Sequence, residues 1–234
     1  NFNDGRPLSW EQEILVSKSL ETIQWLSSHD VKFEPIYSRQ SFIKEGKHIF
    51  WGGLTLASEN EGVGLFDQEL AAFLSLGGKI FYENAVSDLL FKDNAVRGIY
   101  IGEKKIESDA VILASGGFEA NDDLRNTFIG DDWLNAKVRG TPYNTGDGIK
   151  MALEIGATKH GLYDGCHATP MDLYMKDYGG LDLDPKERKN YRKICYFLGV
   201  MINAKGQRFL DEGKNFRNYT YAQYGRKVLE QPNH

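Results

Sequence analysis

The chain has 234 residues, of which 41% are hydrophobic and 26% charged, and its net charge is −5. This length suffices for one large or two smaller globular domains, and the acidic balance argues against a nucleic-acid partner. No apolar run approaches the roughly 18 residues of a membrane helix, and the N-terminus does not resemble a signal peptide. Because Cys166 and Cys195 lie outside any C-x-x-C spacing, we expect free thiols in a reducing, cytoplasmic compartment.

The first third of the chain predicts two helices joined by a loop region. Ser9 and Gln12 form a capping-box pattern, after which apolar residues recur at helical spacing as far as residue 29, followed by an extended piece ending at Pro35. Residues 36–66 are rich in glycine and predict a loop. Gly62-Val63-Gly64 lacks the third glycine and the preceding strand of a dinucleotide fingerprint. We therefore interpret it as the opening of a helix over 65–76 that stops at two glycines.

The middle of the chain predicts an antiparallel meander that leads into a buried strand. Short polar turns separate four predicted strands, at residues 79–82, 85–92, 95–101 and 106–109. The apolar run Ala110–Ala114 then ends in Ser115-Gly116-Gly117, a pattern typical of a strand buried on both faces and followed by a tight turn. Taken alone, this pattern is more often structural than part of a cofactor site.

Two further motifs follow in order. Thr145-Gly146-Asp147-Gly148 precedes an amphipathic helix that ends at Gly156, and such a loop directs backbone N–H groups toward a polar or anionic ligand. Residues 199–212, GVMINAKGQRFLDE, predict a β-hairpin. Together with SGGF at 115–118, these motifs resemble the fumarate reductase and succinate dehydrogenase flavoprotein family. Within the family, the chain most resembles the FAD-dependent tricarballylate dehydrogenases, judged from RGTPYNTGDG at 139–148, GCH at 165–167 and FRNYTYAQYG at 216–225.

The resemblance implies that the chain binds FAD, with no metal. In the family, the strand end with its Gly-Gly turn, the TGDG loop and the first meander strand approach the cofactor. The matching residues are Val86, Ala114, Ser115, Gly116, Gly117, Thr145, Gly146 and Asp147. Two of these have ordinary alternatives, since Val86 can be a simple strand residue and Asp147 a helix cap.

The resemblance also implies a substrate site. His167 lies 20 residues after Asp147, where the family places a histidine that binds a substrate carboxylate, and Thr169 follows it. Arg217 matches the arginine that donates the proton in the family. An arginine in a dry site can also orient the carboxylates of the substrate. The alternatives are a structural His167 and a surface Arg217 paired with an acidic residue at 211 or 212. Arg208 is expected to support the hairpin.

These observations predict an α/β fold with α+β features. Residues 1–160 would form part of a Rossmann-like FAD-binding domain with a β-meander, and residues 161–234 the N-terminal part of a substrate-capping domain. The implied activity is hydride exchange between FAD and a C–C bond beside a carboxylate, with tricarballylate, fumarate or succinate-like acids as substrates and an unidentified electron partner. The Thr-Glu and Arg-Gly pairs of fumarate reductases are missing from residues 171–198, which argues against fumarate itself.

Two alternatives stay open: a 3-ketosteroid dehydrogenase-like flavoenzyme, and a non-catalytic binding module on the same scaffold. The family's N-terminal G-x-G-x-x-G unit and its C-terminal part do not occur in this sequence. We therefore expect the 234 residues to be an internal fragment that binds FAD weakly and is inactive in isolation.

Overall fold

The chain divides into two compact units, Asn1–Glu83 and Asn84–His234. The computed structural model describes residues 9–50, 55–160, 163, 166–179, 181 and 183–233. The predicted division into an FAD-binding domain over residues 1–160 and a capping domain over residues 161–234 stays a prediction. Across the described ranges, no helix combines the length and the apolar character needed to cross a membrane.

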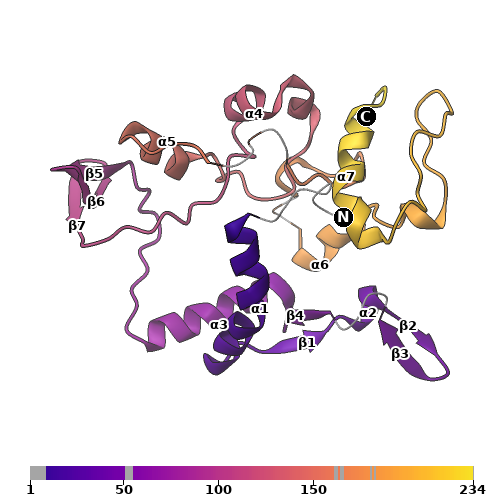
Figure 1. The fold of residues 1–234 in the computed structure, drawn as a ribbon, viewed down its shortest axis with the longest axis horizontal. Helices are drawn as coiled ribbons and strands as arrows, with labels where there is room; N and C mark the ends of the chain where they lie inside the picture. Colours follow the sequence, from indigo (N-terminus) through magenta and orange to yellow (C-terminus); the bar gives the residue numbers. More distant parts are fainter. Residues whose placement is uncertain are drawn as a thin grey trace. The chain divides into compact units, whose positions relative to one another are not determined.

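The first unit contains two long helices and two small antiparallel sheets (Figure 1). Strand β1 pairs with β4, and β2 pairs with β3. The elements are α1 (Trp10–Ser28), β1 (Phe33–Pro35), α2 (Tyr37–Gln40), β2 (Ser41–Lys44), β3 (Lys47–Phe50), β4 (Leu56–Ser58) and α3 (Glu61–Ser75). The predicted capping box of α1 is confirmed, because Ser9 Oγ accepts from the Gln12 N–H at 3.3 Å and Gln12 Oε1 accepts from the Ser9 N–H at 2.9 Å.

The prediction of a continuous loop over residues 36–66 is wrong, although residues 51–54 of this range lie outside the described residues. Residues 41–50 form the β2–β3 hairpin, whose turn residues Glu45 and Gly46 both have positive φ, at 51° and 75°. Turns of this hand match the right-handed twist of paired strands. The glycine at 46 therefore marks a hairpin turn rather than a loop.

The second unit begins with the predicted meander. Strands β5 (Asp88–Lys92), β6 (Ala95–Ile101) and β7 (Lys104–Glu107) form an antiparallel sheet in this order. Three details of the prediction are wrong: residues 79–82 form no strand, the first strand of the sheet starts at residue 88 rather than 85, and the last strand covers residues 104–107 rather than 106–109. Leu89 and Leu90 are buried on β5, which also contacts the helix after the TGDG loop.

The predicted buried strand at Ala110–Ala114 is the largest correction. The segment follows the end of β7 but belongs to no sheet among the described residues, and Ile112 is 90% exposed. A strand is stabilised by a neighbour that pairs with its backbone and covers its faces. The apolar sequence of this segment favours a strand, but no described segment pairs with its backbone.

Helices and 3₁₀ turns make up the rest of the second unit. They are α4 (Asp122–Ile129), η1 (Asp131–Asn135), α5 (Asp147–Glu154), η2 (Asp177–Gly179), α6 (Pro185–Arg188), η3 (Lys189–Tyr191), η4 (Tyr196–Leu198) and α7 (Arg217–Leu229). The predicted hairpin over 199–212 is reduced to one bridge between Ile202 and Arg208, around a turn that closes with the Asn203 N–H donating to Gln207 O at 2.9 Å.

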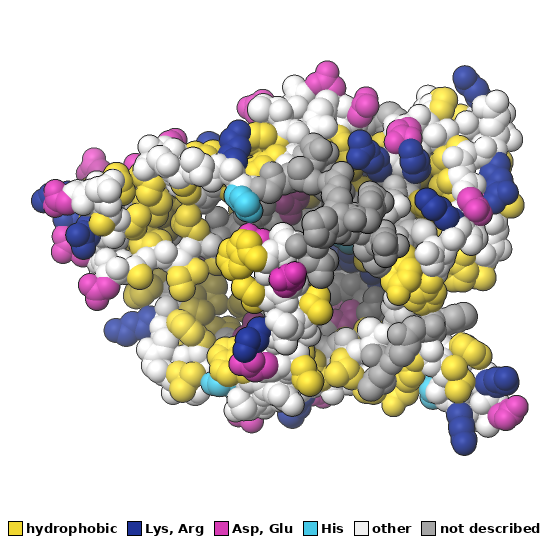
Figure 2. All heavy atoms as spheres, in the orientation of Figure 1, with side chains coloured by type: hydrophobic (Ala, Val, Ile, Leu, Met, Phe, Trp, Pro, Cys, Tyr) yellow, Lys and Arg dark blue, Asp and Glu magenta, His cyan; other side chains and the backbone are white. Residues whose placement is uncertain are grey.

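Among the residues that the structure describes, few hydrophobic side chains are buried, and many others reach the surface, as the face in Figure 2 shows. In the first unit Val31 is buried. The buried hydrophobic residues of the second unit are Leu89, Leu90, Trp133, Val138, Met151, Met175, Tyr196 and Tyr224.

Candidate functional site

The two glycine-rich loops of the second unit are joined by backbone hydrogen bonds. The Gly146 N–H donates to the Gly117 carbonyl at 3.0 Å, and the Ala120 N–H donates to the Asn144 carbonyl at 3.0 Å. The side chain of Asn121, the N-cap of α4, adds a third link by donating to the Thr145 carbonyl at 2.9 Å. Motifs about 30 residues apart in sequence therefore form one local structure.

Glycine is favoured at the points where these loops meet. At Gly116, with φ of +80°, a Cβ would lie 2.6 Å from Asn144 Oδ1. At Gly146, also with φ of +80°, it would lie 2.6 Å from Leu124 Cδ1, and at Gly148 it would collide with Ser115 Oγ. Residues with a Cβ rarely adopt a φ near +80°, and a Cβ at any of these three positions would push a neighbouring side chain away. The glycines therefore allow the two loops to approach each other closely.

The predicted cofactor-binding residues surround this junction. Asp147 is exposed as the first residue of α5, and one of its carboxylate oxygens, Oδ2, accepts from Thr145 Oγ1 at 2.7 Å. A carboxylate in the first turn is also favoured by the helix dipole, so the capping role proposed for Asp147 fits as well. Ala114 and Ser115 are exposed, and Val86 is half-buried in the segment that enters β5.

An aromatic cluster leads from the glycine turn toward the predicted substrate segment. Phe118 stacks on Tyr163, with ring centroids 6.3 Å apart and planes 4° from parallel. Phe128 contacts both rings at 5.4 and 5.1 Å, and Lys159 Nζ lies 4.1 Å from the Phe128 centroid. This arrangement links the loop at 115–118 to the chain four residues before His167.

The segment 166–170 packs on α7. The exposed ring of His167 meets Tyr221 edge-on, with centroids 5.3 Å apart. Gly225 lies directly against the backbone of this segment, since a Cβ there would come within 2.6 Å of the Thr169 nitrogen. The hydroxyl of half-buried Thr169 points to Met171 Sδ at 3.5 Å. His167 and Thr169 therefore differ, because only the histidine ring is exposed.

Arg217 is the first residue of α7 and lies one helical turn before Tyr221, so His167 contacts the helix face that carries Arg217. The Arg217 guanidinium carbon is 6.0 Å from the Phe197 ring centroid. The backbone of the same turn is held by Tyr196, whose hydroxyl lies 2.5 Å from Thr220 Oγ1 and 3.4 Å from the Arg217 carbonyl.

Tyr196 and Glu212 are among the residues of this region whose pKa values are shifted. Burial raises the pKa of Tyr196, while its hydrogen bond with Thr220 and the charge of Arg217 act in the opposite direction. Glu212 has a lowered pKa, first because its carboxylate accepts from the Met201 N–H and then because it pairs with Arg208. Arg208 reaches Glu212 Oε2 at 2.5 Å. The expected structural role of Arg208 thus agrees with its contacts.

Several residues that connect the loop junction, the His167 segment and α7 were not predicted from the sequence. Asn121 carried a recognisable N-cap signal ahead of a helix. The others act through contacts that are distant in sequence and had no local signature. They are Phe118, Glu119, Asn144, Tyr163, Tyr196 and Tyr221.

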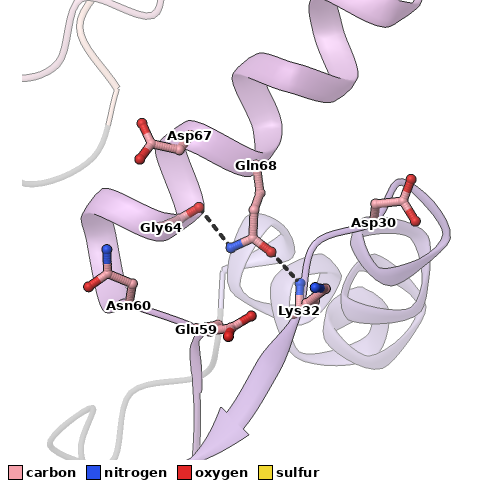
Figure 3. A pocket seen from close by; sticks show the side chains of 7 residues that line it. All are labelled: Asp30, Lys32, Glu59, Asn60, Gly64, Asp67 and Gln68. Atoms are coloured by element: carbon pink, nitrogen blue, oxygen red, sulfur yellow. Dashed lines mark hydrogen bonds between the residues drawn. The ribbon is translucent and has the colours of Figure 1, made fainter.

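A separate cleft of about 530 Å³ lies in the first unit (Figure 3). Gln68 spans its wall, accepting from the Lys32 N–H at 2.8 Å and donating to the Gly64 carbonyl at 2.8 Å. The remaining lining residues are polar or acidic: Asp30, Glu59, Asn60 and Asp67. None of the predicted site residues lines this cleft.

Relatives of this chain carry the names of oxidoreductases and dehydrogenases. NADH:acrylate oxidoreductase of Vibrio harveyi is 28% identical over 86% of this chain and 19% of its own length. The 3-oxosteroid 1-dehydrogenase of Mycolicibacterium smegmatis is 28% identical over 67% of this chain and 27% of its own length. The chain thus spans about a fifth to a quarter of these relatives.

The fold is similar to a flavocytochrome c3 fumarate reductase in its open conformation, with a TM-score of 0.61 and 22% identity over 94% of this chain and 36% of that one. This similarity, together with the mixture of helices and antiparallel strands in the structure, confirms the predicted fold class, α/β with α+β features. The family model described as FAD binding domain matches residues 11–233, nearly the whole chain. The chain therefore belongs to the FAD binding domain family, whose cofactor is FAD.

Proposed function

We propose that this chain is part of an FAD-dependent oxidoreductase that exchanges a hydride with a C–C bond beside a carboxylate or carbonyl. The observation that carries the proposal is the arrangement of the second unit. The glycine turn at 115–117 and the loop at 145–148 form one junction, while the segment with His167 lies on the helix of Arg217. The Phe118–Tyr163 stack connects the junction proposed to hold the cofactor with the segment proposed to hold the substrate, which supports the proposal.

The residues at the loop junction suit FAD. Glycines at 116, 146 and 148 let the two loops pack closely, and Gly116, Ser115 and Asp147 are exposed at their junction, where a ligand can reach them. The Asp147 carboxylate is an acceptor, so it suits the hydroxyl-bearing part of FAD rather than its phosphates. Bound FAD would supply the hydride acceptor or donor, and the loops would position it.

His167 and Arg217 are proposed to hold the substrate. A histidine that contacts one face of a helix and an arginine on that face can bind a carboxylate or polarise a carbonyl, and Arg217 would pass the proton at the substrate carbon. Tricarballylate and succinate-like acids are the proposed substrates. That the protein has an electron-transfer partner, and that it is located in the cytoplasm, are also predictions from the sequence.

A 3-ketosteroid dehydrogenase-like activity is the second candidate. It is supported by the 28% identity to a 3-oxosteroid 1-dehydrogenase, since 67% of this chain aligns with that relative. A carbonyl substrate would use the same cationic face, so the two candidates differ in the substrate that reacts. A non-catalytic module would bind FAD and react with neither class.

The test is an absorption spectrum of the purified protein at its full natural length, followed by substrate addition. We expect the bands of oxidised flavin, and bleaching by tricarballylate or succinate-like acids but not by ketosteroids. Arg217→Lys should retain the flavin and lose most turnover, whereas Arg226→Lys, at an exposed position of the same helix, should leave turnover unchanged. Bleaching by ketosteroids alone favours the second candidate, and a colourless protein that takes up no FAD contradicts both.

A further inference from the structure

Asn144 contacts both loops of the cofactor junction at once. Its Nδ2 donates to Glu119 Oε1 at 2.5 Å, and its backbone carbonyl accepts from the Ala120 N–H. Its Oδ1 lies over Gly116, where a Cβ would come within 2.6 Å of it. The carboxamide of Asn144 thus lies against the glycine turn with its oxygen and donates to Glu119 with its nitrogen.

Glu119 holds the other end of this bridge. One carboxylate oxygen accepts from Asn144, and the other lies 2.9 Å from the position that a Cβ on Gly117 would occupy. The residue is half-buried, and a hydrogen bond to a carboxylate is stronger than one between neutral groups. We propose that Glu119 and Asn144 are positioning residues of the FAD site: their hydrogen bond sets the separation of the two loops and thereby the affinity for FAD.

The hydrogen bond can be broken and then rebuilt in reverse. Asn144→Asp places two carboxylates face to face, which repel each other. Adding Glu119→Gln to that variant restores the bond with donor and acceptor exchanged, because the new amide at position 119 donates to the new carboxylate at position 144. The double variant also has the net charge of the original pair.

The experiment is a fluorescence titration with FAD of the protein at its full natural length. Asn144→Asp is expected to weaken FAD binding by about tenfold or more, and the double variant to return within about threefold of the original affinity. Glu119→Gln alone keeps an acceptor and should also stay within about threefold. Melting temperatures without FAD, together with the visible spectrum of the bound flavin, separate a local effect on the loops from unfolding.

Each outcome bears on the proposal. An unchanged affinity in Asn144→Asp overturns it, and so does a double variant as weak as Asn144→Asp, since the negative charge at 144 would then explain the loss. Should Asn144→Asp fail to fold, Glu119→Ala removes the acceptor without adding charge and is expected to weaken binding severalfold; full affinity there overturns the proposal. The inference rests on the proposed FAD-dependent function. If the unsubstituted protein takes up no FAD, the proposed function itself is contradicted, whereas a failure seen only in the variants contradicts the role of Glu119 and Asn144.

Discussion

At the scale of single residues, Glu212 shows how one side chain holds a poorly paired segment together. It is 4% exposed as a residue, and its carboxylate accepts from the Met201 N–H at 2.6 Å and from Arg208. These contacts connect the two arms of the 199–212 segment, which also share one β-bridge and the hydrogen bonds of the turn between Asn203 and Gln207. The Glu212 carboxylate therefore makes hydrogen bonds between the two arms where paired strands would make backbone ones.

The lowered pKa of Glu212 predicts an acid-sensitive contribution to stability. Because the folded-state pKa lies below the ordinary value of 4.5, the contribution is complete above that value and is lost as the pH falls through the folded-state pKa. We expect Glu212→Gln to lower the melting temperature at pH 7 and to flatten its decline below about pH 4.5. Glu230→Gln, an exposed member of a surface pair, is the control and should change neither.

Gly225 is predicted to be intolerant of any side chain. Its added Cβ would meet backbone atoms of Ala168 and Thr169, which cannot rotate away. Gly225→Ala should cost about 1–3 kcal/mol in unfolding free energy and displace the His167 segment from α7. Denaturant unfolding measures the first effect. At Gly213 a Cβ would make an ordinary 3.7 Å contact, so Gly213→Ala should change stability by less than about 0.5 kcal/mol.

At the scale of elements, the sequence predicted helix ends better than strands. The capping box of α1, the glycine stop after α3 and the end of α5 before Gly156 are local signals, and all three occur in the structure. Residues 79–82 and 110–114 had strand propensity but form no strand. A helix closes its hydrogen bonds within one segment, whereas a strand depends on a partner that its own sequence does not specify.

The exposed segment 110–114 gives an element-scale prediction. Ile112→Ala should change the unfolding free energy of the chain by less than about 0.5 kcal/mol, because 90% of that residue is exposed. Leu89→Ala, on β5 and 5% exposed, should cost about 2–5 kcal/mol. Denaturant unfolding of both variants checks the pair, and a large loss for Ile112→Ala would show that this residue is packed.

At the scale of the whole molecule, sequence motifs located the candidate site but not what holds it together. The SGGF and TGDG motifs were recognisable because glycine patterns are local. Their junction depends on Asn144, Glu119 and Asn121, whose partners lie about 25 residues away in sequence. Ordinary polar residues carry no such information until the fold brings them together. The roles of the eight cofactor residues, His167, Thr169 and Arg217 stay predictions.

The division into two units gives the last prediction. All of the predicted FAD contacts, from Val86 to Asp147, belong to the unit Asn84–His234. A ligand stabilises the structure that it binds, and local opening is suppressed most where it makes contact. Hydrogen–deuterium exchange with and without FAD should therefore show slower exchange at residues 115–121 and 144–150, with the amides of α1 unchanged. Protection confined to α1 and its neighbours would instead place the cofactor on the first unit, and the glycine junction would then be a structural feature only.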